Sequence, residues 1–90
     1  MKIPRRFELY GRTIRVVFGN LNGAAYAQWE FAKDLITIDP DAPRDHRDQA
    51  FLHEFIHAAL ESLGREDLSI DEKFVDGLAG LVHQMLKSSK

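Results

Sequence analysis

Two histidines four residues apart, with a glutamate directly after the first, are the residues of this chain best suited to chemistry. They are His53, Glu54 and His57, within residues 51–58. On a helix, positions i and i+4 lie on one face about a turn apart, so both imidazoles can reach one metal ion while Glu54 points in a neighbouring direction. This spacing is typical of zinc sites in which the glutamate is a general base.

The chemistry that such a site predicts is hydrolysis by a metal-activated water. Catalytic zinc takes three protein ligands and leaves one position for water, whose pKa it lowers to roughly 7. Glu54 would accept the proton of the attacking water and pass it to the leaving amine of a peptide. We therefore expect one zinc ion, with His53 and His57 as ligands and Glu54 as the catalytic residue.

The same five-residue pattern also occurs by chance in unrelated helices, where it marks two partly exposed histidines and a solvated acid. Here apolar neighbours surround the motif, among them Leu52, Phe55, Ile56 and Ala59. Two ionisable rings and a carboxylate are costly to bury there without partners, and a metal ion would supply them. Because a closed structural site uses similar ligands, a catalytically silent zinc-binding scaffold for a protein partner is the alternative.

The third ligand is expected to be a carboxylate at the start of the last helix, where Asp71, Glu72 and Asp76 are the candidates. At about 100° per residue, Asp71 lies near the centre of the apolar stripe, Glu72 roughly 120° from it, and Asp76 almost opposite. Glu72 also fits the N3 position of a capping box that Ser69 begins. The pattern leaves Asp71 and Glu72 as alternatives and predicts that Asp76 faces solvent.

Strand signals dominate the first half of the chain. The predicted strands are residues 7–10 and 13–18, joined by a tight turn at Gly11-Arg12, then residues 24–31, and finally residues 35–39, which end at Pro40. They predict a small antiparallel sheet of about four strands in two hairpins. An exposed edge of that sheet, either residues 24–31 or residues 35–39, is expected to hold an extended peptide by main-chain hydrogen bonds.

The second half predicts two helices, at about residues 43–63 and 70–87. The first runs from Pro43 to the breaker Gly64 and is apolar on most faces beyond its polar opening, so it belongs inside the fold. The second begins near the capping box of Ser69 and carries one apolar stripe. The whole chain, residues 1–90, is therefore expected to be one α+β domain in which the sheet precedes the helix that bears the histidines.

The sequence predicts surface or core positions, outside the metal site, for most of the remaining candidates. His46 lies two turns before the motif in the polar helix opening, and His83 lies roughly 140° from the stripe centre, so both are predicted to be surface histidines. Tyr26 and Trp29 are expected in the core of a half-buried strand rather than in a substrate cleft. Tyr10 would contribute to the site only if the fold brought it to the metal.

Composition limits the classes of function. The chain has 90 residues, 44% of them hydrophobic, and 12 Lys and Arg are scattered among 14 Asp and Glu, for a net charge of -2. This balance suits one compact domain and offers no basic stripe for nucleic acid. The absence of cysteine limits any metal site to nitrogen and oxygen ligands. Without a signal-peptide pattern or an apolar run that could span a bilayer, a cytoplasmic protein without membrane association is expected.

These features resemble small phage-encoded zincin-like metallopeptidases and, more distantly, the peptidase domain of the ImmA/IrrE group. The resemblance covers short strands, the run at residues 51–58 and the acidic helix start at residues 69–75. It implies that His53 and His57 bind zinc, that Glu54 is the catalytic acid and base, and that the substrate is a protein or peptide. Because many relatives carry a glutamate at the position of Glu72, it favours Glu72 over Asp71 as third ligand. The chain lacks the third histidine of metzincins and the long C-terminal subdomain of larger zincins.

Overall fold

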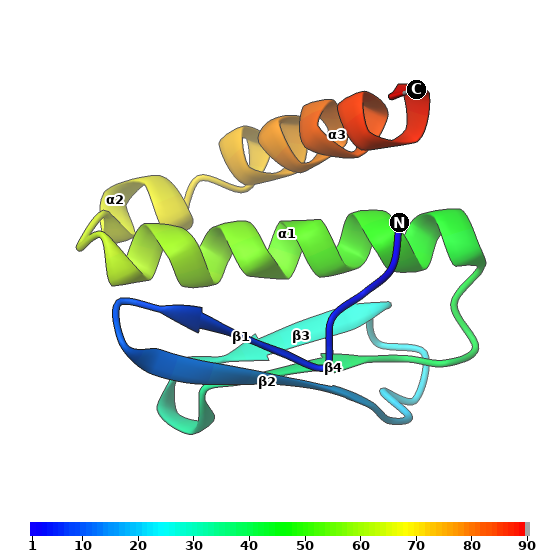
Figure 1. Cartoon of the computed structure of the whole chain (residues 1–90), viewed down its shortest axis with the longest axis horizontal. Coiled ribbons are helices and arrows are strands. Elements are labelled where there is room, and N and C mark those ends of the chain that lie inside the picture. Colours follow the sequence, from blue (N-terminus) through cyan, green and yellow to red (C-terminus); the bar gives the residue numbers. More distant parts are fainter. Residues whose placement is uncertain (90) are drawn as a thin grey trace.

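A sheet and two long helices form three successive layers, with α1 between the sheet and α3 (Figure 1). The computed structural model describes residues 1–89. The elements are β1 (Arg6–Leu9), β2 (Arg12–Phe18), β3 (Ala27–Glu30), the 3₁₀ helix η1 (Phe31–Lys33), β4 (Leu35–Ile38), α1 (Arg44–Ser62), α2 (Glu66–Ser69) and α3 (Glu72–Ser88). This architecture confirms the predicted α+β fold class.

The sheet has the strand order β1-β2-β4-β3. β1 pairs with β2 and β3 with β4, both antiparallel, so the two predicted hairpins are confirmed. β2 and β4 are parallel, with Val16 opposite Ile36, and the sheet is therefore mixed rather than antiparallel throughout. Turn residues determine which strands pair inside a hairpin. The pairing between two hairpins depends instead on which of their strands is buried. Ile36 and Ile38 are fully buried, so β4 occupies the interior of the sheet and β3 its edge.

Two of the predicted strand boundaries shift. The first turn consists of Tyr10 and Gly11, both with positive φ (49° and 80°), one residue earlier than predicted. Two successive positive φ values are typical of the turn that matches the twist of a hairpin, and glycine adopts the second without strain. β3 begins at Ala27 instead of Ala24, because residues 22–24 form a turn and bend ahead of it.

α1 is buried on two sides, as predicted for a helix that is apolar on most faces. The core is formed by residues of the sheet, of α1 and of α3: Ile14, Val16, Ala27, Ile36, Ile38, Phe51, Leu52, Ile56, Leu60, Val75 and Ala79. The helix ends next to Gly64, whose φ of 74° confirms the left-handed conformation expected there. None of the helices within residues 1–89 combines the length and apolar character needed to cross a membrane.

The start of α3 differs from the prediction. Residues Glu66–Ser69 form the short helix α2, which was not predicted, and Ser69 is buried inside the fold. The N-cap of α3 is Asp71, whose Oδ1 accepts a hydrogen bond of 3.1 Å from the backbone N–H of Phe74. The predicted capping box of Ser69 and Glu72 is therefore wrong. Because Asp71 caps the helix, the carboxylate of Glu72 is free for another role.

Candidate metal centre

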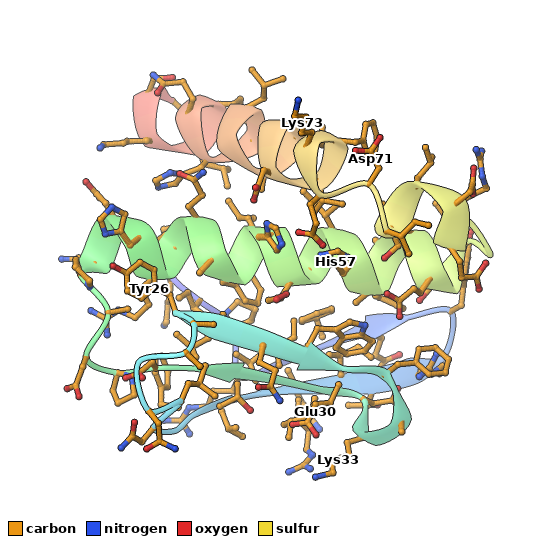
Figure 2. All side chains as sticks on the ribbon, turned by 180° about the vertical axis from the view of Figure 1, so that it is seen from behind. Tyr26, Glu30, Lys33, His57, Asp71 and Lys73 are labelled. Carbon is orange, nitrogen blue, oxygen red and sulfur yellow. The ribbon has the colours of Figure 1, made fainter. Side chains whose placement is uncertain are left out.

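Three potential ligand atoms converge where α1 meets the first turn of α3. The Nε2 atoms of His53 and His57 lie 3.1 Å apart. Glu72 places Oε2 3.2 Å from Nε2 of His53 and Oε1 3.2 Å from Nε2 of His57. Figure 2 shows His57 on α1 beneath the beginning of α3. Of the two third ligands that the sequence left open, the fold brings Glu72 to the histidines.

The spacing of these atoms suits a small divalent ion. Nitrogen and oxygen ligands lie about 2.0–2.2 Å from zinc, which places any two of them about 3.3–3.5 Å apart in a tetrahedron. The observed separations of 3.1 and 3.2 Å are close to that value. The side chains of His53 and His57 are 20% and 14% exposed, whereas that of Glu72 is 63% exposed. The two imidazoles therefore lie on the sheltered side of the site, and the carboxylate of Glu72 lies on the side that faces solvent.

The contacts of the two Nδ1 atoms indicate which imidazole nitrogens carry a proton. Ser69 Oγ donates to Glu61 Oε2 at 2.9 Å and lies 2.9 Å from Nδ1 of His57. Because the serine has a single hydrogen, its oxygen accepts the N–H of His57 Nδ1. Nδ1 of His53 lies 2.6 Å from Oδ1 of Asp76, so this carboxylate favours a proton on Nδ1. In neutral rings that are protonated at Nδ1, both Nε2 atoms carry a lone pair and no proton.

This arrangement places only acceptors at the centre of the cluster. Two unprotonated Nε2 atoms cannot bond each other, and the carboxylate of Glu72 also offers only lone pairs. Partly buried acceptors without donors are unfavourable, and a cation between them would satisfy all three. Two imidazoles whose Nδ1 atoms contact Ser69 and Asp76, together with a carboxylate, form a donor set suited to catalytic zinc. The residues present therefore fit a zinc ion.

The support for His57 extends to the sheet. Trp29 Nε1 donates to Glu61 Oε1 at 3.0 Å, so Trp29, Glu61 and Ser69 form one chain of hydrogen bonds that ends at His57. The chain joins β3, α1 and α2. Sequence reasoning gave neither Glu61 nor Ser69 a role at the site. Glu61 lies four residues after His57 and hence on the same helix face, which was a usable signal. No local pattern pointed to Ser69.

Glu54 lies beside the cluster and is not part of it. Its Oε2 is buried and has no hydrogen-bond partner within residues 1–89. Burial raises the pKa of the Glu54 carboxyl to about 7, while the nearby His53 acts in the opposite direction. Glu54 and His53 line a common hollow of about 550 Å³. An unpartnered carboxylate next to the ligands is placed as a base requires, and a neighbouring cation would favour its charged form.

The hollow lies between α1 and the edge strand β3. It is lined by Ala25, Tyr26, Ala27, His46, Gln49, Ala50, His53, Glu54 and Asp76. Because the N–H of Asp39 donates to the carbonyl of Tyr26 at 2.8 Å, alternate residues of β3 face β4 and the others face outward. The backbone groups of Ala27 and Trp29 are thus directed to the open edge. Of the two edges considered from sequence, β3 is the exposed one and β4 is internal.

The angular ranking of the acidic residues failed for an identifiable reason. It centred the buried stripe of α3 on apolar residues that include Phe74 and Met85, both of which are exposed. The residues of α3 that are buried are Val75 and Ala79. This rotation turns Glu72 toward α1. It also brings Asp76 to His53, so Asp76 is 68% exposed, as predicted, but has a contact that the prediction missed.

The other predicted residues lie elsewhere. Asp71 caps α3, as described above, and does not belong to the cluster. His46 is exposed as expected, whereas His83 is half-buried on α3 outside the cluster. Tyr10 is 77% exposed in the turn between β1 and β2, at the edge of the sheet opposite β3. Tyr26 is 47% exposed at the hollow, which contradicts its predicted place in the core.

The chain was compared with models of protein families, with curated proteins and with solved structures, and none of them matches. The resemblance to small phage-encoded zincin-like metallopeptidases therefore stays a prediction from the motif. A functional assignment depends on the geometry of this site.

A matched pair of variants tests which of the two acidic residues at the start of α3, Asp71 or Glu72, binds zinc. Glu72→Gln is expected to weaken zinc binding by at least roughly 100-fold, because a ligand is lost. Asp71→Ala is expected to lower the free energy of unfolding by about 1 kcal/mol through loss of the cap, with unchanged zinc affinity. Calorimetric zinc titration and thermal unfolding measure both effects. The reverse pattern, with affinity lost only in Asp71→Ala, would make Asp71 the ligand.

Proposed function

We propose that this protein is a zinc-dependent peptidase. In this proposal, His53, His57 and Glu72 hold one zinc ion and Glu54 is the general base. The observation that supports it most strongly is the convergence of three lone-pair donors next to Glu54, whose buried Oε2 has no hydrogen-bond partner among the described residues. A purely structural site would need the ligands but would gain nothing from the unpartnered Glu54, which is costly to bury.

The proposed mechanism assigns each residue one task. A zinc ion in this site would polarise the peptide carbonyl and lower the pKa of a water molecule to roughly 7. Glu54 accepts the proton of that water as it attacks, and returns the proton to the leaving nitrogen when the peptide bond breaks. Ser69 and Asp76 hold the imidazoles by their Nδ1 atoms, so that Nε2 stays directed at the site.

The proposed substrate is a protein or peptide segment in extended form. The outward backbone groups of Ala27 and Trp29 allow it to pair with β3 as an additional strand. Side chains of such a segment would enter the hollow that contains Glu54. We place this activity in the cytoplasm, and the bound metal and the peptide are the only partners that the proposal requires.

A zinc-binding scaffold without catalytic activity is the second candidate, and one observation favours it. The outer side of α3 and the segment between α2 and α3 expose large apolar side chains, a property of surfaces that bind other proteins. These side chains are Ile70, Phe74, Leu78, Leu81 and Met85. In this alternative, zinc contributes to the stability of the fold, and the protein partner lies on α3.

A cleavage assay separates the two candidates. The zinc-loaded protein is incubated with a library of unstructured peptides, whose products are identified by mass spectrometry. The peptidase predicts cleavage that a chelator abolishes and added zinc restores. If the protein binds one equivalent of zinc and melts lower with chelator, yet cleaves no peptide, the scaffold is the correct description.

A further inference from the structure

An aromatic pair forms one wall of the hollow beside the metal centre. The rings of Tyr26 and His46 are stacked, with centroids 5.3 Å apart and planes 9° from parallel. Tyr26 precedes β3 and His46 lies in the first turn of α1, so the pair joins the sheet edge to the helix. Both residues are exposed, and both line the hollow that contains His53 and Glu54. This wall has no role in the mechanism proposed above.

The distance along α1 determines what the wall can contact. His46 precedes His53 by seven residues, or two turns, which corresponds to roughly 10 Å along the helix axis. A side chain at that distance does not reach a carbonyl that is being attacked at the metal centre. An extended peptide advances about 3.3 Å per residue, so the wall lies about three residues from the scissile bond. The wall is therefore placed to bind a substrate side chain and not to stabilise the reacting atoms.

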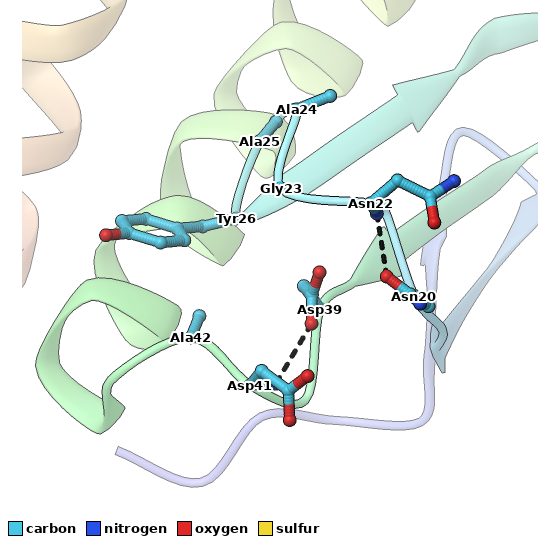
Figure 3. A pocket seen from close by; sticks show the side chains of 9 residues that line it. All are labelled: Asn20, Asn22, Gly23, Ala24, Ala25, Tyr26, Asp39, Asp41 and Ala42. Carbon is cyan, nitrogen blue, oxygen red and sulfur yellow. Dashed lines mark hydrogen bonds between the residues drawn. The ribbon is translucent and has the colours of Figure 1, made fainter.

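Tyr26 also borders a second hollow, of about 510 Å³ (Figure 3). His46 does not line this second hollow, so Tyr26 has a face that His46 leaves uncovered. Asp39 and Asp41 line this second hollow together with Tyr26. Asp39 is buried and accepts hydrogen bonds from the N–H groups of Leu21 and Asp41, at 3.1 and 2.9 Å, whereas Asp41 is exposed. Among residues 1–89, no lysine or arginine lines either hollow.

We propose that the uncovered face of Tyr26 binds an arginine side chain of the substrate, about three residues from the scissile bond. This inference rests on the proposed peptidase function and specifies its substrate. A guanidinium is flat and weakly hydrated, so it stacks on an aromatic ring better than the ammonium of lysine. The carboxylates of Asp39 and Asp41 attract its charge. An uncharged aromatic side chain would stack on Tyr26 but would gain nothing from the two carboxylates.

The test is a positional scan with the zinc-loaded protein. A fluorogenic peptide that the protein cleaves is remade with arginine, lysine or citrulline at each position on both sides of the scissile bond. Citrulline has the shape of arginine without its charge. We expect kcat/KM to be roughly fivefold higher for arginine than for citrulline at one position about three residues away, with lysine in between. Replacing Tyr26 is expected to remove this preference at that position alone.

Two variants of Tyr26 and one control make the outcome decisive. Tyr26→Ala removes the ring, and Tyr26→Leu keeps apolar bulk without a flat face, in case the smaller side chain disturbs β3. Tyr10→Ala is the control, because Tyr10 is equally aromatic and lies at the far turn of the sheet. Cleavage without an arginine preference, or a preference that survives in Tyr26→Leu, overturns this subsite and leaves the peptidase intact. Failure of the zinc-loaded protein to cleave any peptide overturns the peptidase and the subsite together.

Discussion

Replacing Glu54 with glutamine is expected to lower the rate of peptide hydrolysis by about two to four orders of magnitude and to leave zinc binding unchanged. Glutamine has the shape of glutamate but cannot accept the proton of the attacking water. Glu54 lies outside the cluster of His53, His57 and Glu72, so no ligand is lost. The measurements are kcat/KM on a cleaved peptide and zinc stoichiometry on the same preparation.

The stability of this variant carries further information. Oε2 of Glu54 is buried without a hydrogen-bond partner within residues 1–89. Replacing the carboxylate with an amide therefore removes no hydrogen bond of this oxygen that stabilises the fold. We expect the free energy of unfolding of Glu54→Gln to equal or exceed that of the wild type. Glu8→Gln, an exposed substitution on β1, is the matched control and keeps full activity. Hydrolysis at the wild-type rate in Glu54→Gln would show that another group is the base.

Replacing His57 with alanine is expected to abolish the stabilisation that zinc gives to the wild type. A ligand present at 100 times its dissociation constant stabilises the folded state by about 2.7 kcal/mol. For a domain of this size, that corresponds to a rise in melting temperature of roughly 10–20 °C. Without His57, the cluster retains one imidazole and one carboxylate, which do not hold zinc at the same concentration. Thermal unfolding with excess zinc and with chelator gives the difference directly.

His83→Ala is the matched control for the loss of a histidine. His83 is half-buried on α3 and lies outside the cluster, so this variant should keep the full zinc-dependent shift. Identical melting of the wild-type protein with zinc and with chelator would contradict a metal centre at these residues. A zinc-dependent shift that persists in His57→Ala would place the ion elsewhere.

Local sequence geometry predicted the part of the site that lies on a single helix. His53 and His57 come together because residues four apart on a helix share a face, whatever surrounds them. The burial of α1 followed equally from local composition, since apolar residues on most faces leave no side for water. The α+β fold and its two hairpins likewise depend on strand periodicity and turn residues, which are properties of neighbouring positions.

The rest of the site depends on how α3 packs, and that is not a local property. The rotation of α3 is determined by the packing of Val75 and Ala79 against α1, and larger apolar residues such as Leu81 remain outside. An average over all apolar positions therefore gave the wrong face, so Asp71 ranked above Glu72 and the contact of Asp76 with His53 was missed. The role of Ser69 depends on α2, a helix of four residues with no signal strong enough to predict it. The parallel pairing of β2 and β4 is also a long-range feature.

The most direct test of the metal centre is an anomalous difference map, recorded at the zinc absorption edge, from crystals of the zinc-loaded protein. We predict one strong peak per chain, about 2.0–2.2 Å from Nε2 of His53, Nε2 of His57 and a carboxylate oxygen of Glu72. A map with no peak between these three residues, or with zinc bound only at other side chains, would contradict the assignment.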